Sequence, residues 1–160
     1  MRAESKKIEY LTLSLLFACY FLWGMLIILH ASLPVWLLFP ALTLLLSFQG
    51  SLQHEVIHYH PTPSQKLNEA LAAPPLSLYL PFIIYRDTHR QHHVLDNITY
   101  PSKDPESAYV TAETWAAMPA WLQGLHKINN TLLGRIFIGP ALGIGGFLWA
   151  EFKKLRAGDK

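Results

Sequence analysis

Two long apolar runs occupy the first third of the chain and predict a pair of membrane helices. The first, residues 11–29, is long enough as a helix to cross a hydrocarbon core of about 30 Å, and the second covers residues 33–53. No Asp, Glu, Lys or Arg occurs between Leu11 and Gln53. The uncharged turn between the runs contains Pro34, which suits the start of a helix. We therefore expect a transmembrane helical hairpin whose second helix continues out of the lipid.

The later apolar segments are less regular, and we expect them to lie at the membrane surface. Residues 70–85 are interrupted by three prolines, which favours a re-entrant or interfacial segment over a full span. Thr111 is expected to cap an amphipathic helix that continues to Leu125 and carries tryptophans suited to a membrane surface. Residues 132–150 contain Arg135, a proline and five glycines, which favours an interfacial or half-inserted helix.

Composition supports a single all-α membrane domain covering residues 1–160. The chain is 51% hydrophobic with a mean hydropathy of +0.21, which favours the membrane class. Cys19 is the only cysteine, so the sequence has neither a disulfide framework nor a cysteine-based metal cage. The net charge of +2, without a basic run interleaved with aromatics, gives no indication of nucleic-acid binding.

The basic residues predict how the hairpin is oriented. Three precede the first apolar run and none lies in the turn, whereas Lys66, Arg86, Arg90 and Lys103 follow the second run. Because positive charge is retained on the cytoplasmic side, this pattern predicts that the N-terminus and residues 54–135 are cytoplasmic.

Five of the eight histidines fall in two clusters inside that cytoplasmic region. His54 and His58 form the first, and His89, His92 and His93 form the second. Imidazoles at i, i+3 and i+4 can leave one face of a helix and bind a metal together. His92 and His93 diverge by about 100° on a helix, which would let them bind two different metals. Imidazole suits iron, copper, nickel and zinc, so the ligand type does not identify the metal.

The first cluster also fits a zinc protease. Residues 54–58 read HEVIH, the HExxH string in which the glutamate, here Glu55, acts as general base. Such a site needs only one further ligand, so the second cluster would have no role. A third hypothesis is a non-catalytic membrane protein that retains part of a ligand set.

Two further residues are candidates for supporting roles around the metal. Glu55 is expected to orient an imidazole as a hydrogen-bond acceptor, with a solvated charge at the helix end as the alternative. His60 is either an auxiliary ligand or hydrogen-bond partner, or a loop residue beside Pro61. His30, in the turn between the apolar runs, is on the opposite side of the membrane, and His126 is expected at the surface.

The two clusters together resemble the histidine boxes of the membrane fatty acid desaturase family. His54 and His58 match its HX3H box, and His89, His92 and His93 match its HX2HH box. Further stretches similar to bacterial members are residues 58–63 (HYHPTP), 101–107 (PSKDPES) and 130–135 (NTLLGR). The same boxes occur in carotenoid hydroxylases and ketolases and in alkane hydroxylases, which are the alternative within this superfamily.

The resemblance implies an O2-dependent oxidoreductase that desaturates fatty acyl chains. It implies a non-haem di-iron centre held by the box histidines, and a fatty acyl lipid, acyl-CoA or acyl-carrier substrate. No flavin or haem motif occurs, so electrons are expected from a ferredoxin and its reductase. A bacterial inner membrane is the expected location. The family also has a third box, another HX2HH after a further hairpin, which this sequence lacks. We therefore expect the chain to be the N-terminal portion of a longer enzyme.

Overall fold

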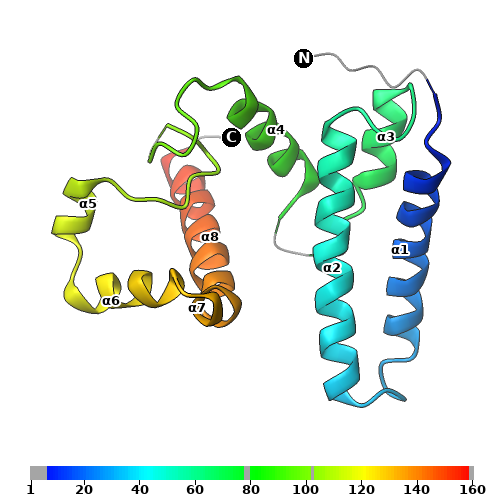
Figure 1. Ribbon diagram of the computed structural model, residues 1–160, viewed down its shortest axis with the longest axis horizontal. Coiled ribbons are helices and arrows are strands. Elements are labelled where there is room, and N and C mark those ends of the chain that lie inside the picture. The colour runs from blue at the N-terminus through cyan, green and yellow to red at the C-terminus, as the bar shows by residue number, and fades with distance from the viewer. Residues whose placement is uncertain (1–6, 78–79, 102, 159–160) are drawn as a thin grey trace. The chain divides into compact units, whose positions relative to one another are not determined.

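A long antiparallel helical hairpin forms the N-terminal part of the computed structural model, which describes residues 7–77, 80–101 and 103–158 (Figure 1). Helix α1 covers Tyr10–Ile28 and α2 covers Val35–Ile57. They are the two helices in the described part of the chain that are long and apolar enough to cross a membrane. All regular elements of the described residues are helices, so the predicted all-α membrane class and its hairpin are confirmed. Helix α2 continues past the apolar run that ends at Gln53 and stops at Ile57, as expected for a second helix that extends out of the lipid.

The hairpin buries only one side of each helix within the protein. Leu16 and Cys19 of α1 pack against Leu45 and Leu52 of α2. Most other large apolar side chains of the hairpin are exposed, including Phe17, Phe21, Ile28, Trp36 and Phe39. Helices that are apolar on all sides need an apolar environment around them, and exposing so much apolar surface to water would be costly. The hairpin therefore belongs in a membrane.

A short helix that the sequence did not predict, α3 (Gln65–Ala72), packs beside the upper part of α2 in Figure 1. Two buried glutamines of α2 hold the backbone that follows it. Gln53 donates from Nε2 to the carbonyl of Ala72 at 3.0 Å, and Gln49 donates from Nε2 to the carbonyl of Pro74 at 3.0 Å. These polar side chains therefore donate hydrogen bonds to backbone carbonyls at and just after the end of α3.

The apolar stretch 70–85 is not one segment in the structure. It contributes the end of α3, a proline-containing loop and the start of α4 (Phe82–Val94), while residues 78 and 79 lie outside the described residues. Pro81 is the N-cap of α4. Phe82 is buried with Val56, Ile57 and Ala72, and this contact anchors the first turn of α4 against α2. The prediction of a single re-entrant or interfacial segment missed this division.

Residues Thr99–Lys160 form a second compact unit, distinct from Met1–Ile98. Thr111 caps its first helix, α5 (Ala112–Ala117), by accepting a hydrogen bond from the Thr114 backbone N–H at 3.1 Å, as predicted. The helix does not continue to Leu125, however. It stops at Met118, because Pro119 cannot supply the N–H that an uninterrupted helix needs, and α6 (Ala120–Asn129) follows.

The expected helix 132–150 is also divided. Helix α7 (Leu132–Phe137) has Ile138 as its C-cap residue, and α8 (Gly139–Ala157) follows with a proline at its start. Thr131 caps α7 by accepting from the Gly134 N–H at 3.0 Å. A proline is tolerated in the first turn of a helix but not in its interior, so Pro140 marks the boundary between α7 and α8.

Candidate metal centre

The first two candidate ligands lie where α2 ends. His54 belongs to the last turn of α2 and His58 is its C-cap residue. Residues four apart in a helix project from the same face, and the two imidazole rings lie with their centroids 4.6 Å apart. The HX3H spacing therefore delivers a pair of ring nitrogens at the end of a membrane-type helix.

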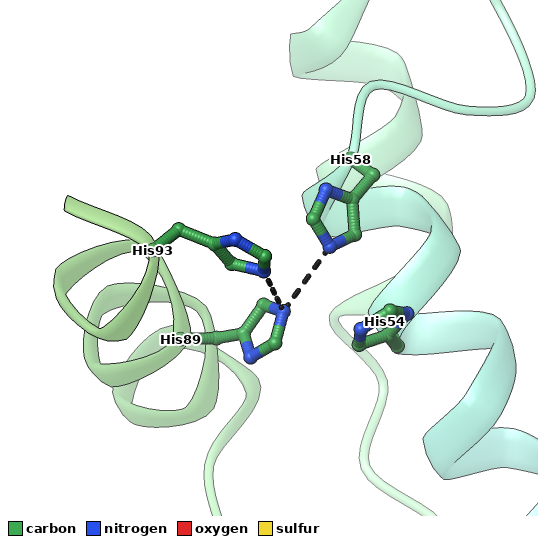
Figure 2. Close-up of side chains that lie close together, drawn as sticks. All are labelled: His54, His58, His89 and His93. Atoms are coloured by element: carbon green, nitrogen blue, oxygen red, sulfur yellow. Dashed lines mark hydrogen bonds between the residues drawn. The ribbon is translucent and has the colours of Figure 1, made fainter. Parts of the chain in front are cut away.

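Helix α4 brings a second pair against the first. His89 and His93 are also four residues apart and face α2 (Figure 2). The Nε2 atom of His89 lies 3.1 Å from Nε2 of His58 and 3.1 Å from Nε2 of His93. The ring centroid of His54 is 4.6 Å from that of His89. One nitrogen from each of the four histidines lies within 4.8 Å of the other three.

This donor set fits one metal ion. For a metal–nitrogen bond of about 2.1 Å, adjacent ligand nitrogens lie about 3.0–3.4 Å apart. The two 3.1 Å separations agree with that range. The remaining nitrogen pairs lie no more than 4.8 Å apart, so small ring movements would bring all four nitrogens to one metal. Four neutral imidazoles suit a first-row transition metal such as iron or zinc.

Burial and repulsion from neighbouring imidazoles favour the ligand form of His58. His89 is 5% exposed, whereas His93 is exposed. Burial lowers the pKa of His58, and the neighbouring His54, His93 and His89 lower it further. A metal binds the neutral ring, so a lowered pKa reduces the competition from protons.

The structure separates His92 from the other four box histidines. His92 is half-buried, and its ring centroid is 5.5 Å from that of His93 and 6.0 Å from that of His89. It is not a member of the four-histidine group found among the described residues. This placement follows from the helix, since consecutive residues point about 100° apart.

The supporting candidates His60 and Glu55 contact other groups. Nδ1 of His60 lies 2.5 Å from the Glu9 carboxylate, so this ring has a hydrogen-bond partner away from the four nitrogens. The Glu55 carboxylate lies 3.8 Å from Nδ1 of His54, which is beyond hydrogen-bonding distance, and its side chain is 52% exposed. The solvated-charge alternative therefore describes Glu55 better than an orienting acceptor does.

Neither remaining histidine joins the group in the described structure. Nδ1 of His30 lies 2.7 Å from the carbonyl oxygen of Ile27, at the end of the hairpin opposite His58. His126 lies in α6 of the second unit, where its ring contacts Trp115.

A charged cluster beside the histidines was missed by the sequence analysis. Glu69 of α3 binds both Arg86 and Arg90 of α4 at 2.6 and 2.8 Å. The i, i+4 spacing of the two arginines was a usable signal, but nothing in the sequence indicated that an acidic residue of another helix faces them. Arg90 also lines a cavity of about 330 Å³ next to His58 and His93.

The hairpin and the convergent histidines define a helical membrane protein with a candidate metal site. The sequence pattern of the fatty acid desaturase family matches residues 31–157, which include both histidine boxes. The chain therefore belongs to the fatty acid desaturase family and is a desaturase-like oxidoreductase. Comparisons with curated proteins and with solved structures gave no significant match.

Proposed function

We propose that this chain serves an O2-dependent, non-haem di-iron oxidoreductase that desaturates fatty acyl chains. One iron would be held by His54, His58, His89 and His93. His92 would belong to the second iron, whose other ligands are not supplied by the described residues. The single observation that carries the proposal is the convergence of both boxes on one point, with one nitrogen of each histidine within 4.8 Å of the others.

The residues of the chain would hold and orient the metal and admit the acyl chain. Helices α2 and α4 fix the direction of the imidazoles before a metal binds, because each ligand pair is one helical turn apart. When bound, iron would supply the activation of O2 and the abstraction of hydrogen from an unactivated C–H bond. The cavity beside His58 and His93 is large enough for part of an acyl chain, and Ile57 and Val94 give it an apolar lining.

The location of the cluster supports a lipid substrate. His54 and His58 end a helix that is long enough to cross the membrane, so an acyl tail could approach the metal from the hydrocarbon region. We place the cluster on the cytoplasmic side of a bacterial inner membrane, because the basic residues follow the positive-inside pattern. A ferredoxin and its reductase would deliver electrons, and an acyl lipid, acyl-CoA or acyl-carrier conjugate would be the substrate.

Elemental analysis and lipid analysis test the proposal together. The full chain, purified from iron-supplemented cells, should contain iron at about one atom per chain, and His93→Ala should lose it. Mass spectrometry of total fatty acids should show added double bonds when the chain is expressed together with any further segment encoded with it. Stoichiometric zinc with no iron would contradict the proposal.

Two alternatives predict different results. A carotenoid or alkane hydroxylase would give iron but a hydroxylated product, because the position of the C–H bond relative to the metal decides the outcome. An HExxH zinc protease would bind one zinc per chain, depend on Glu55 and be indifferent to His92. The convergence of His89 and His93 with the first box disfavours the protease, since its site would need only one of them.

A further inference from the structure

Glu69 lies at the junction of the helices that carry the two histidine boxes. It belongs to α3, and its Oε2 accepts from Nη1 of Arg86 at 2.6 Å while its Oε1 accepts from Nη2 of Arg90 at 2.8 Å. We propose that Glu69 is a positioning residue for the metal centre, which holds α4 at the rotation that directs His89 and His93 toward α2. This inference rests on the proposed metal-binding function.

The geometry of α4 explains why such a residue is needed. Successive residues of a helix are about 100° apart, so Arg86 and Arg90 lie about 60° around the axis from His89 and His93. Phe82 lies on the histidine face and is buried against α2. The arginines attach the neighbouring face to α3. Contacts on two adjacent faces, made to two different helices, prevent α4 from turning about its own axis.

Small rotations of α4 would matter for metal binding. A turn of about 30° moves a side-chain atom at a radius of about 5 Å by on the order of 3 Å. Metal sites tolerate deviations of only about 0.2 Å in ligand distance. His89 is the ligand nearest to two others, at 3.1 Å from both His58 and His93. It is therefore the ligand whose displacement would most disturb the set.

The same hydrogen-bond network reaches α2 between its two ligands. Gln65, one turn before Glu69 on α3, donates from Nε2 to Oε1 of Glu69 at 3.0 Å and to the backbone carbonyl of Val56 at 3.1 Å. Val56 lies between His54 and His58 and is fully buried. The network thus connects the backbone of the first box, through α3, to the helix of the second box.

The charges of Glu69, Arg86 and Arg90 stabilise the network in which Glu69 binds both arginines. Burial raises the pKa of Glu69, but hydrogen bonds from Gln65, Arg86 and Arg90 outweigh it and leave the pKa below its usual value, so the carboxylate is ionised at neutral pH. The side chains of Glu69 and Arg86 are only 23% and 22% exposed. Without the carboxylate, two half-buried guanidinium groups would repel each other one turn apart and would also disfavour a nearby cation.

Cobalt titration of the full chain in detergent tests this role without requiring turnover. Co²⁺ binding is followed by its visible absorption, whose intensity and position report coordination geometry, and helix content is followed by circular dichroism. We expect Glu69→Gln to weaken Co²⁺ binding about 10- to 100-fold, as loss of a group that orients ligands does, and to change the absorption spectrum. Helix content should stay within a few per cent of wild type.

Asp87→Asn is the matched control. Asp87 also pairs with Arg86, at 2.8 Å from its Nε, but both residues belong to α4, so this pair cannot connect two helices. We expect Co²⁺ affinity within about twofold of wild type for this variant. An equal loss of affinity in Asp87→Asn and Glu69→Gln would show that charge alone matters and would overturn the positioning role.

A double-mutant cycle shows whether Glu69 acts through the arginines. In a background of Arg86→Gln and Arg90→Gln, Glu69→Gln should have little further effect on Co²⁺ affinity, since the bridge is already broken. Fully additive losses would contradict the proposal. If Glu69→Gln loses helix content, the double variant Arg86→Gln, Arg90→Gln breaks the same bridge from α4 and should itself weaken Co²⁺ binding; unchanged affinity in that double variant would overturn the proposal.

The possible failures remain distinguishable. Wild-type protein that binds no Co²⁺ would refute the metal centre itself. Wild-type protein that binds Co²⁺ at the histidines, with an unchanged affinity and spectrum in Glu69→Gln, would refute the positioning role and leave the metal centre intact.

Discussion

The two compact units of the chain differ in how their helices are held in place. In the unit Met1–Ile98, buried side chains join α1 to α2 and α2 to α4, and the buried Gln49 and Gln53 hydrogen-bond to backbone 25 and 19 residues away. In the described part of the unit Thr99–Lys160, Asp104 and Gly134 are the buried residues. Its helices are held mainly by caps, turns and chain connectivity.

This difference indicates where the function is encoded. A metal site needs ligands whose positions are fixed before the metal arrives, and only the N-terminal unit has a packed interior around its histidines. The C-terminal unit exposes Leu132, Leu133, Phe137, Trp149 and Phe152. Such surfaces require lipid or another protein surface to cover them.

The largest expected effect comes from removing the central ligand of the N-terminal unit. His89→Ala should weaken Co²⁺ or Fe²⁺ binding by more than about 100-fold, because a direct ligand matters more than the groups that orient ligands. Metal content and Co²⁺ titration measure it. His126→Ala in the second unit is the control and should bind metal as the wild type does. Equal losses in the two variants would remove the distinction between the units.

Asn68→Ala tests how much the buried hydrogen bonds of the N-terminal unit contribute to its stability. Asn68 is fully buried; its Oδ1 accepts from the N–H and the hydroxyl of Thr62, and its Nδ2 donates to the Thr62 carbonyl. Leaving those groups without partners should destabilise the unit by about 2–3 kcal/mol, measured by denaturant unfolding. Asn130→Ala, at an exposed position, should change stability by less than about 0.5 kcal/mol.

Gly134→Ala tests the C-terminal unit at its tightest contact. A Cβ added at Gly134 would lie only 1.8 Å from the backbone oxygen of Ile128, so α6 and α7 would have to separate. We expect about 1–3 kcal/mol of destabilisation, seen as faster hydrogen exchange in residues 120–137, with Co²⁺ binding retained. Gly143→Ala is the control, because nothing lies within 4 Å of its added Cβ. Slower exchange in Gly134→Ala would contradict the structure.

The smallest effect concerns the pH dependence contributed by Glu69 in the metal-free protein. Its pKa is depressed in the folded state, so its stabilising contribution is fully present above the unfolded-state value of about 4.3 and is lost as pH falls through the lower folded value. The difference in unfolding free energy between wild type and Glu69→Gln should therefore shrink as pH drops below about 4.3. If the difference in unfolding free energy instead grew on acidification, the pKa of Glu69 could not be depressed in the folded state.

Features of the fold and the site that depend on local sequence patterns could be predicted from the sequence. The hairpin followed from uninterrupted apolar runs, and the pairs His54/His58 and His89/His93 followed from helical spacing. The divergence of His92 from His93 also followed from that spacing. These are local properties, and secondary structure alone determines them.

Contacts between distant residues could not be predicted in the same way. Glu9 pairs with His60 across 51 positions, and Glu69 reaches Arg86 and Arg90 from a different helix, α3, of only eight residues. Their partners depend on how α3 packs against α2 and α4. The helix breaks marked by Pro119 and Pro140 were missed because apolar periodicity continued across them, although both prolines were visible in the sequence.

X-ray absorption spectroscopy of the chain loaded with one equivalent of Co²⁺ tests the central claim most directly. The account predicts one metal per chain, surrounded by about four imidazole nitrogens at about 2.1 Å, with imidazole scattering reduced or metal lost in His89→Ala. A site with mainly oxygen ligands, or an unchanged spectrum in His89→Ala, would contradict the claim that His54, His58, His89 and His93 form the metal centre.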